Sequence, residues 1–270
     1  MIAAPRAVPM PAGTLLVVAL GSIAGVLAFA WPLLLSPASG ATGAIEAPWL
    51  FVAVLPLLVL VMLAEVSAGR LDARALAMLG VLAALGAALR PLGGGTAGVE
   101  TVFVLLVIGG RVFGPGFGFV LGPITLFASA LITGGVGPWL PFQMLAASWV
   151  GLGAGLLPPM MRGRAELVLL AAYGAVAAVI YGLAMNLWFW PFALGLGTEL
   201  SYAAGAPVLE NLQRFAVFSV ATSLGWDIGR AITTVILVAL LGPAVLGALR
   251  RAARRASFAR SRLTSRQSRS

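Results

Sequence analysis

Long apolar segments alternate with short stretches rich in glycine, proline and arginine along most of this chain. The segments lack period-two alternation, and most approach the roughly 20 residues that a helix needs to cross a bilayer core about 30 Å thick. Because a backbone exposed to lipid must satisfy its own hydrogen bonds, we expect transmembrane helices. The pattern predicts eight of them, at 13–35, 49–66, 73–89, 99–109, 114–132, 141–157, 166–190 and 215–241.

These segments indicate an all-α, polytopic membrane bundle. Of the 270 residues, 61% are hydrophobic and 9% are charged, which is typical of an integral membrane protein. We expect an N-terminal extension with two helices at 1–72, a six-helix membrane domain at 73–245 and an unstructured arginine-rich tail at 246–270. The segment at 99–109 is too short to span upright, so we expect it to tilt, to extend into its loops or to be partly re-entrant.

Arginines in the connecting stretches predict the topology. With eight helices, the arginines that fall on one side are Arg6, Arg70, Arg74, Arg111, Arg162, Arg164 and those of the tail. The positive-inside rule then puts both termini in the cytoplasm of a cell whose plasma membrane holds the protein. Eight arginines lie between 250 and 269, and we expect this tail to lie beside anionic lipid headgroups rather than to bind nucleic acid.

The residue types that are missing exclude most catalytic chemistry. The chain contains no lysine, histidine or cysteine, so it has no phosphate-binding loop ending in Gly-Lys-Ser/Thr, no Ser–His or Cys–His pair and no thiolate or imidazole ligand. We therefore expect neither an enzyme nor a conventional ATPase, and we expect no metal ion and no cofactor.

Asp227 and Arg230 are the most informative charged residues. They lie three residues apart, mid-way along the last predicted helix, so they share one face and can pair. Ionisable side chains at membrane depth are costly unless they are paired or hydrated, and they often mark functional sites. A purely structural ion pair that locks helix packing is an equally open interpretation.

Polar and aromatic residues gather at the predicted outer ends of the helices. We expect them to form an apolar pocket with a few fixed polar contacts, suited to an amphipathic ligand of intermediate size. The alternative for the tryptophans is an interfacial aromatic belt. The candidates are Arg90, Glu100, Trp139, Gln143, Asn186 and Trp190, with Asp227.

Small residues form a stripe along the third predicted helix. Ala77, Gly80, Ala84 and Ala88 recur three or four residues apart, after Ala73, and therefore lie on one face. Such a stripe lets two membrane helices approach closely. It predicts either a docking face for another membrane protein or internal packing in an alanine-rich chain.

Residues 73–241 resemble the substrate-binding S component of energy-coupling factor (ECF) transporters, which import vitamins and other micronutrients. The resemblance is carried by the small-residue stripe, the glycine loop at 90–98 before Glu100, the glycine-rich stretches at 111–118 and 133–141, and the Trp226-Asp227…Arg230 pattern. The pattern is most similar to actinobacterial S components associated with cobalamin or its precursors.

This resemblance implies a protein that captures a vitamin-like substrate from outside, with the seven pocket candidates as its binding residues. It also implies that the stripe docks on a membrane T component that carries two ATPases, so that ATP hydrolysis belongs to these partners. The two helices before residue 73 are not part of the usual unit. Riboflavin, thiamine and other heterocyclic micronutrients remain open beside cobalamin.

Three other functions stay open. An ion-coupled secondary transporter could use Asp227 as its coupling carboxylate, although the two halves of the chain show no convincing inverted repeat. A membrane-embedded transferase would need reactive groups of which this chain has few. A scaffold subunit that binds no ligand and transports nothing is the third alternative.

Overall fold

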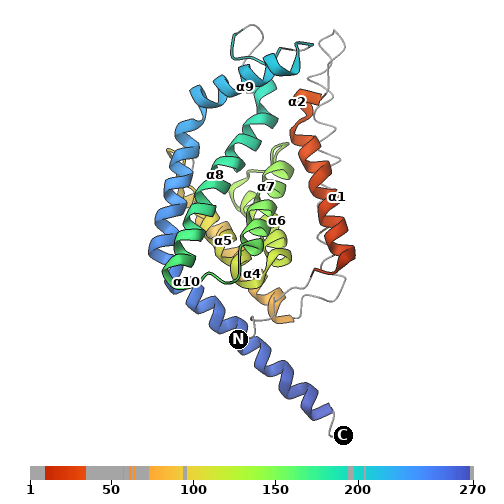
Figure 1. Ribbon diagram of the computed structural model, residues 1–270, viewed down its shortest axis with the longest axis vertical. Coiled ribbons are helices and arrows are strands. Elements are labelled where there is room, and N and C mark those ends of the chain that lie inside the picture. Colours follow the sequence, from red (N-terminus) through yellow and green to blue (C-terminus); the bar gives the residue numbers. More distant parts are fainter. Residues whose placement is uncertain are drawn as a thin grey trace.

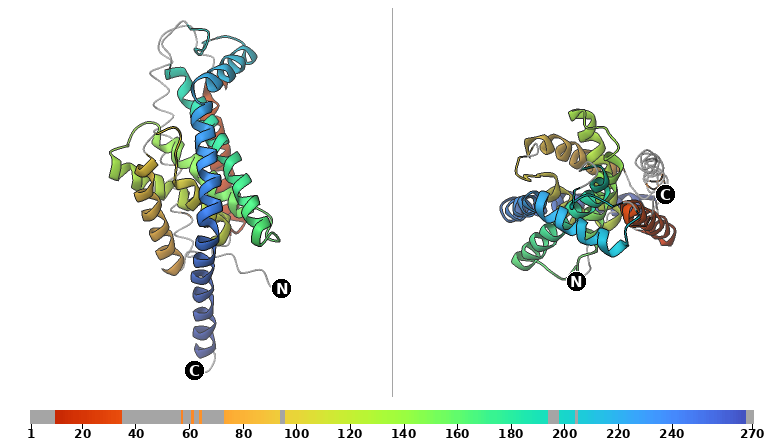
Figure 2. Two further views of the ribbon diagram at one scale, coloured as in Figure 1. Left: turned by 90° about the vertical axis from the view of Figure 1, so that its left-hand side faces the viewer. Right: turned by 90° about the horizontal axis from the view of Figure 1, so that it is seen from above.

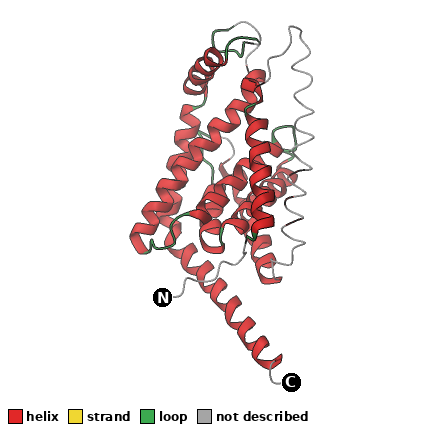
Figure 3. Ribbon diagram, turned by 45° about the vertical axis from the view of Figure 1, so that its right-hand side comes forward, coloured by secondary structure: helices red, strands yellow, loops and turns green. Residues whose placement is uncertain are grey.

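In the computed structural model, the regular elements of the described residues are all α-helices (Figure 3). The structure describes residues 10–34, 57, 61, 64, 73–93, 96–193, 198–203 and 205–267. The helix predicted at 49–66 therefore lies almost wholly outside the described residues.

Most of the longer helices lie side by side in one bundle (Figure 1). Their order is α1 (Ala12–Phe29), α2 (Trp31–Leu34), α4 (Ala73–Gly93), α5 (Val102–Phe113), α6 (Pro115–Thr133), α7 (Leu140–Leu156), α8 (Gly163–Ala193), α9 (Val208–Thr222) and α10 (Leu224–Gln267). Figure 1 shows α4 to α7 in the middle, with α8 and α10 on one side and α1 on the other. The most extensive contacts join α6 to α7 and α8 to α10.

Within the described residues, five helices are long and apolar enough to cross a membrane. They are α1, α4, α6, α8 and the first part of α10, while α5 and α7 are shorter apolar helices. The all-helical, membrane-embedded architecture is thus supported, and the total of eight membrane helices stays a prediction. The bounds of α4, α6, α7 and α8 lie within four residues of the predicted ones.

The short segment before Arg111 forms a central helix enclosed by its neighbours. Helix α5 has 12 residues, about 18 Å of helix at 1.5 Å per residue, and every residue from Val102 to Gly110 is buried. A helix that is apolar on all faces is stable in a protein core or in a lipid bilayer. Helices α4, α6, α7, α8 and α10 contact α5, so its sequence reflects burial inside the bundle.

Glycines set the close packing around α5. A Cβ atom added at Gly110 or at Gly118 would overlap the carbonyl group of Gly151 on α7. The backbones of α5, α6 and α7 therefore approach to a distance that only glycine permits. The glycine-rich stretch at 111–118 thus serves helix packing.

The predicted helix at 215–241 is wrong in its bounds, because Ser223 separates two helices. Helix α9 begins at Val208, inside the predicted loop, and lies across the end of the bundle, while α10 starts at Leu224 and runs down its side (Figure 1). The Thr222 hydroxyl donates to the Phe218 carbonyl, and such back-bonding is associated with bent helices. The described residues of 73–245 therefore form seven helices, of which α9 is not among the candidate membrane spans, and the six membrane helices of this domain stay a prediction.

Helix α10 continues past the bundle to Gln267, as the left view of Figure 2 shows. The tail at 246–270 was expected to be unstructured. The structure instead has residues 246–267 as helix, so that expectation is corrected over this range.

Candidate functional site

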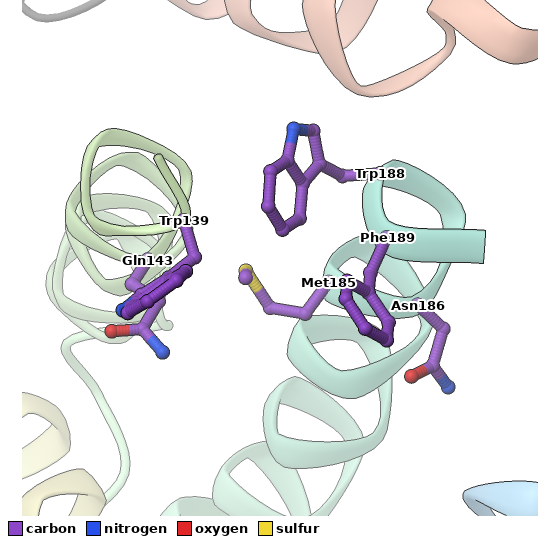
Figure 4. A pocket seen from close by; sticks show the side chains of 6 residues that line it. All are labelled: Trp139, Gln143, Met185, Asn186, Trp188 and Phe189. Carbon is purple, nitrogen blue, oxygen red and sulfur yellow. The ribbon is translucent and has the colours of Figure 1, made fainter. Parts of the chain in front are cut away.

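An open cavity of about 370 Å³ lies between the start of α7 and the C-terminal part of α8. This volume falls in the range of about 300–1,000 Å³ that is usual for small-molecule sites. In the view of Figure 4, the α7 residues form one side, Asn186 lies at the opposite side, and the other α8 side chains lie between them. The lining residues are Trp139, Gln143, Met185, Asn186, Trp188 and Phe189.

Two amides are the polar groups of this cavity. The Arg90 guanidinium donates to Gln143 Oε1 over 3.2 Å, and since a guanidinium only donates, the orientation of the Gln143 amide is fixed. Asn186 Nδ2 is buried and has no hydrogen-bond partner among the described residues. A buried amide donor without a partner is uncommon in folded proteins. In Figure 4 the Asn186 amide points away from α7.

A network of charged side chains adjoins the cavity. Arg90 Nε lies 4.0 Å from Glu100 Oε1, in the loop between α4 and α5. On α10, Arg230 donates to Asp227 Oδ1 over 2.8 Å and to the Ala178 carbonyl over 3.3 Å. Two arginines and two carboxylates therefore balance one another at this end of the bundle.

Tyr181 on α8 packs against Arg230 and against the buried face of α5. The Arg230 guanidinium carbon lies 5.4 Å from the centre of the Tyr181 ring, a distance at which a cation is attracted by the ring face. Tyr181 also packs edge-on against Phe103, with ring centres 5.1 Å apart. The side chains of α5, α8 and α10 thus meet directly at this network.

Asp227 lies in the first turn of α10, and not mid-way along a helix as the sequence suggested. The break at Ser223 causes this difference. A carboxylate near a helix N-terminus is stabilised by the unpaired backbone N–H groups there. The Asp227 side chain is only 5% exposed, so both this effect and the Arg230 pair compensate a nearly complete loss of hydration.

Two glycines allow the 96–101 loop and α8 to pack directly against α10 at this network. Gly98 has a φ of 76°, in the left-handed region, and a Cβ atom there would overlap the Trp226 carbonyl. A Cβ atom at Gly182 would overlap the Asp227 carboxylate. The loop at 96–101 and the face of α8 therefore contact the first turns of α10 with no space for a side chain between them.

Glu100 lies in the loop between α4 and α5, and its carboxyl group is largely removed from water. Burial raises the pKa of its carboxyl above the usual range, against the opposing effects of Arg90 and Arg230 and a hydrogen bond from the Val102 backbone. Its Oε1 atom is buried and accepts no hydrogen bond among the described residues. The 4.0 Å separation from Arg90 is too long to offset the lost hydration fully.

Six of the seven predicted binding residues belong to the cavity or to the adjoining ion network. Trp139, Gln143 and Asn186 line the cavity, while Arg90, Glu100 and Asp227 belong to the adjoining network. The seventh residue, Trp190, is fully buried elsewhere and donates to the Leu200 carbonyl over 2.7 Å. Its ring packs against Tyr202, Phe215 and Phe218. Trp190 therefore packs between the 198–203 segment and α9.

Three cavity residues were absent from the predicted set: Met185, Trp188 and Phe189. The two aromatic residues belong to the run at 188–192, whose tryptophans the sequence also allowed as an interfacial belt. Met185 carries no sequence signal, because methionine is common in any apolar helix.

The N-terminal helix α1 supports the wall of the cavity. Phe29 packs edge-on against Phe142 with ring centres 4.9 Å apart, and Phe142 lies 5.1 Å from the cavity residue Trp188. The Trp149 indole on α7 donates to the Ser22 hydroxyl on α1 over 3.0 Å. Helix α1 is thus part of the packed structure behind the cavity.

The small-residue stripe of α4 lies on its exposed face. Ala77, Gly80, Ala84 and Ala88 are all exposed, and a Cβ atom at Gly80 would meet no atom within 4 Å. The described residues of this chain leave the stripe uncovered, so it does not serve internal packing there.

A second ion cluster lies at the opposite end of the bundle. Glu166 Oε1 accepts from Arg111 Nε over 2.7 Å and from an Arg250 guanidinium nitrogen over 2.6 Å. Arg111 also donates to the carbonyls of Leu157 and Met161. Sequence inspection treated Arg111 as the end of a segment and Arg250 as part of the tail, and it missed the carboxylate that joins them.

No family model, no curated protein and no solved structure matches this chain. Among the residues that the structure describes, no three carboxylates lie together in a way that could hold a metal ion. The interpretation of the site therefore rests on its own geometry.

Proposed function

We propose that this protein is the substrate-binding membrane subunit of an ECF-type micronutrient importer. The observation that carries the proposal is the cavity lined by aromatic side chains and two amides, beside a balanced ion network at one end of a membrane bundle. Few fixed polar groups among apolar walls are typical of sites that bind without reacting. Cobalamin or a precursor is the leading substrate candidate.

The residue types favour binding over chemistry. The cavity lining contains no acid, base or nucleophile of the kinds used in hydrolysis, and the chain has no lysine or histidine that could supply one. We therefore assign ATP hydrolysis to partner subunits, namely a T component with two ATPases. The sequence motifs that carry the resemblance support this assignment.

The exposed stripe of α4 is the proposed docking face for the T component. Small side chains on a lipid-facing helix permit close helix–helix contact, and this stripe is exposed on the described part of the chain, with open space around Gly80. Bulky residues there would hold the partner helix away. The stripe lies on one side of α4, and α6 packs against that helix.

The proposed orientation has both termini on the cytoplasmic side of the plasma membrane. Arg111 and Arg250 meet at Glu166, and Arg111 also contacts the 157–161 segment that precedes Arg162 and Arg164. Several of the arginines used to predict the topology therefore gather at one end of the bundle. This supports the positive-inside assignment.

The ion-coupled transporter is less well supported. Its coupling carboxylate, Asp227, pairs with Arg230 at 2.8 Å and contacts α8 at Gly182. A coupling carboxylate must be free to exchange its ion, whereas Asp227 is engaged by Arg230 and packed against α8. A scaffold without a ligand would not need the cavity or the buried Asn186 donor.

The test is uptake of labelled cyanocobalamin in cells that express the chain with a T component and two ATPases. Replacing Gly80 and Ala84 together by leucine is expected to abolish uptake and to leave binding to the purified protein intact. The matched control changes the equally exposed Val81 to leucine and Leu85 to isoleucine, off the stripe, and should retain uptake. Undiminished uptake by the Gly80/Ala84 variant would exclude the docking role.

The binding function itself has a separate test. The chain is purified in mild detergent from its native membrane and measured by native mass spectrometry. A bound small molecule is the expected result. An empty protein that also fails to bind a panel of vitamins would refute the proposed function.

A further inference from the structure

The residues that line the cavity carry no charge. They are four apolar or aromatic residues of α8 and α7 together with Gln143 and Asn186. The nearest charged groups are already paired, Arg90 with Glu100 and Gln143, and Arg230 with Asp227. A charged ligand would lose hydration in this cavity and would find no unpaired counter-charge in compensation.

The amides of the cavity offer donors. Gln143 uses its carbonyl oxygen for Arg90, so its Nε2 amide group is the part left for a ligand. The buried Nδ2 of Asn186 has no partner among the described residues. Figure 4 draws Gln143 on the α7 side of the space between the two helices, whereas Asn186 lies beyond Phe189 and points away from α7. The Gln143 amide is therefore the donor that a ligand in this space would meet.

The walls suit a flat ring. Trp139 is 43% exposed and Phe189 is 49% exposed, large fractions for aromatic side chains that border a cavity. Met185 points into the space between α7 and α8 in Figure 4. Aromatic faces and a thioether pack well against planar conjugated rings.

From these observations we infer that the part of the substrate held in this cavity is an uncharged flat ring that carries carbonyl or ring-nitrogen acceptors, as lactams and carboxamides do. This inference rests on the proposed binding function and narrows its substrate class. It excludes substrates whose ring is a cation, such as thiamine, and substrates that place a carboxylate or phosphate in the cavity.

The first experiment identifies what the full-length protein binds. Molecules that copurify from native membranes are identified by mass spectrometry, and two pairs of probes are then titrated against the tryptophan fluorescence of the emptied protein. The pairs are riboflavin with riboflavin 5′-phosphate, and nicotinamide with nicotinate; thiamine serves as the cation. We expect a neutral copurifying molecule, and at least about tenfold tighter binding of the neutral member wherever a pair binds.

The outcomes distinguish a failure of the inferred substrate class from a failure of the proposed binding function. A copurifying molecule with a charged ring or a charged group on it, or tighter binding of the charged probes, overturns the inferred substrate class and leaves the binding function standing. An empty protein that binds none of the probes and no cyanocobalamin overturns the binding function, and the inference falls with it.

Substitutions at the two amide residues test the uncharged lining of the cavity. Asn186→Asp keeps the shape of the side chain, but it replaces an amide donor by a carboxylate. We expect the fraction of protein that copurifies with a bound molecule to fall by about tenfold or more. Gln213→Glu makes the same chemical change on the exposed face of α9 and should leave that fraction unchanged.

A second variant covers the case in which Asn186→Asp does not fold. Gln143→Glu gains an ion pair with Arg90, so it should fold, and it loses the donor while adding a charge to the cavity. Reduced occupancy is again expected. Increased occupancy in either variant would mean that the bound group is a cation, and it would overturn the inference.

Discussion

Replacing Glu166 by glutamine is expected to destabilise the bundle by about 3 kcal/mol. Glu166 is 1% exposed and holds two arginines from distant parts of the chain, Arg111 on α5 and Arg250 on α10. The substitution keeps the size of the side chain and removes its charge. Arg111, only 6% exposed, would then be a buried cation without its carboxylate.

The magnitude follows from the burial of each partner. Removing one member of a buried ion pair costs about 3–5 kcal/mol, because the other member stays desolvated without compensation. Arg111 keeps its hydrogen bonds to the carbonyls of Leu157 and Met161, which favours the lower end of that range. Arg250 is 39% exposed, and its pair with Glu166 adds no more than about 1 kcal/mol.

The free energy of unfolding is measured by denaturant titration of the purified protein in detergent micelles. Glu210→Gln is the matched control, since Glu210 and Arg214 form an exposed pair on α9 and the expected loss is about 0.5 kcal/mol or less. The double variant Glu166→Gln with Arg111→Met should recover much of the loss, because it leaves no buried cation. Equal destabilisation by Glu166→Gln and by the control would refute the reasoning.

Three further changes probe the candidate site. Gly182→Ala should cost about 1–3 kcal/mol and displace the ion pair beneath it, whereas Gly225→Ala, with open space around it, should be tolerated in the same melting assay. Phe29→Ala should cost about 3–5 kcal/mol and weaken ligand binding, while the exposed Val26→Ala changes both little; equal effects would contradict the supporting role of α1. Because burial raises the pKa of Glu100, its contribution favours folding below about pH 4.5 and is lost as the pH rises through the raised value. Glu100→Gln should therefore lose less stability than the wild type as the pH rises above about 4.5. Since the chain has no histidine, carboxyl groups dominate that range, and identical pH profiles of melting temperature would exclude this role.

Part of the site was predictable because polar side chains are rare within the apolar segments of this chain. Gln143 and Asn186 stand out in the sequence for this reason, and both line the cavity. Trp190 stands out equally but is fully buried against α9. Its sequence neighbour Trp188 lines the cavity, and only the rotation of α8 relative to its neighbours distinguishes the two.

Hydrophobic run length determined the fold class and the bounds of α4, α6, α7 and α8. Each apolar segment in lipid must satisfy its own backbone hydrogen bonds by forming a helix, so this outcome depends on each segment alone. The tertiary structure decided which side chains meet. It broke the last helix at Ser223, enclosed α5, joined Arg111 to Arg250 through Glu166, and brought Asp227 against Gly182. These outcomes depend on packing between segments far apart in the chain, where glycines set how closely the backbones approach, and no single segment carries that information.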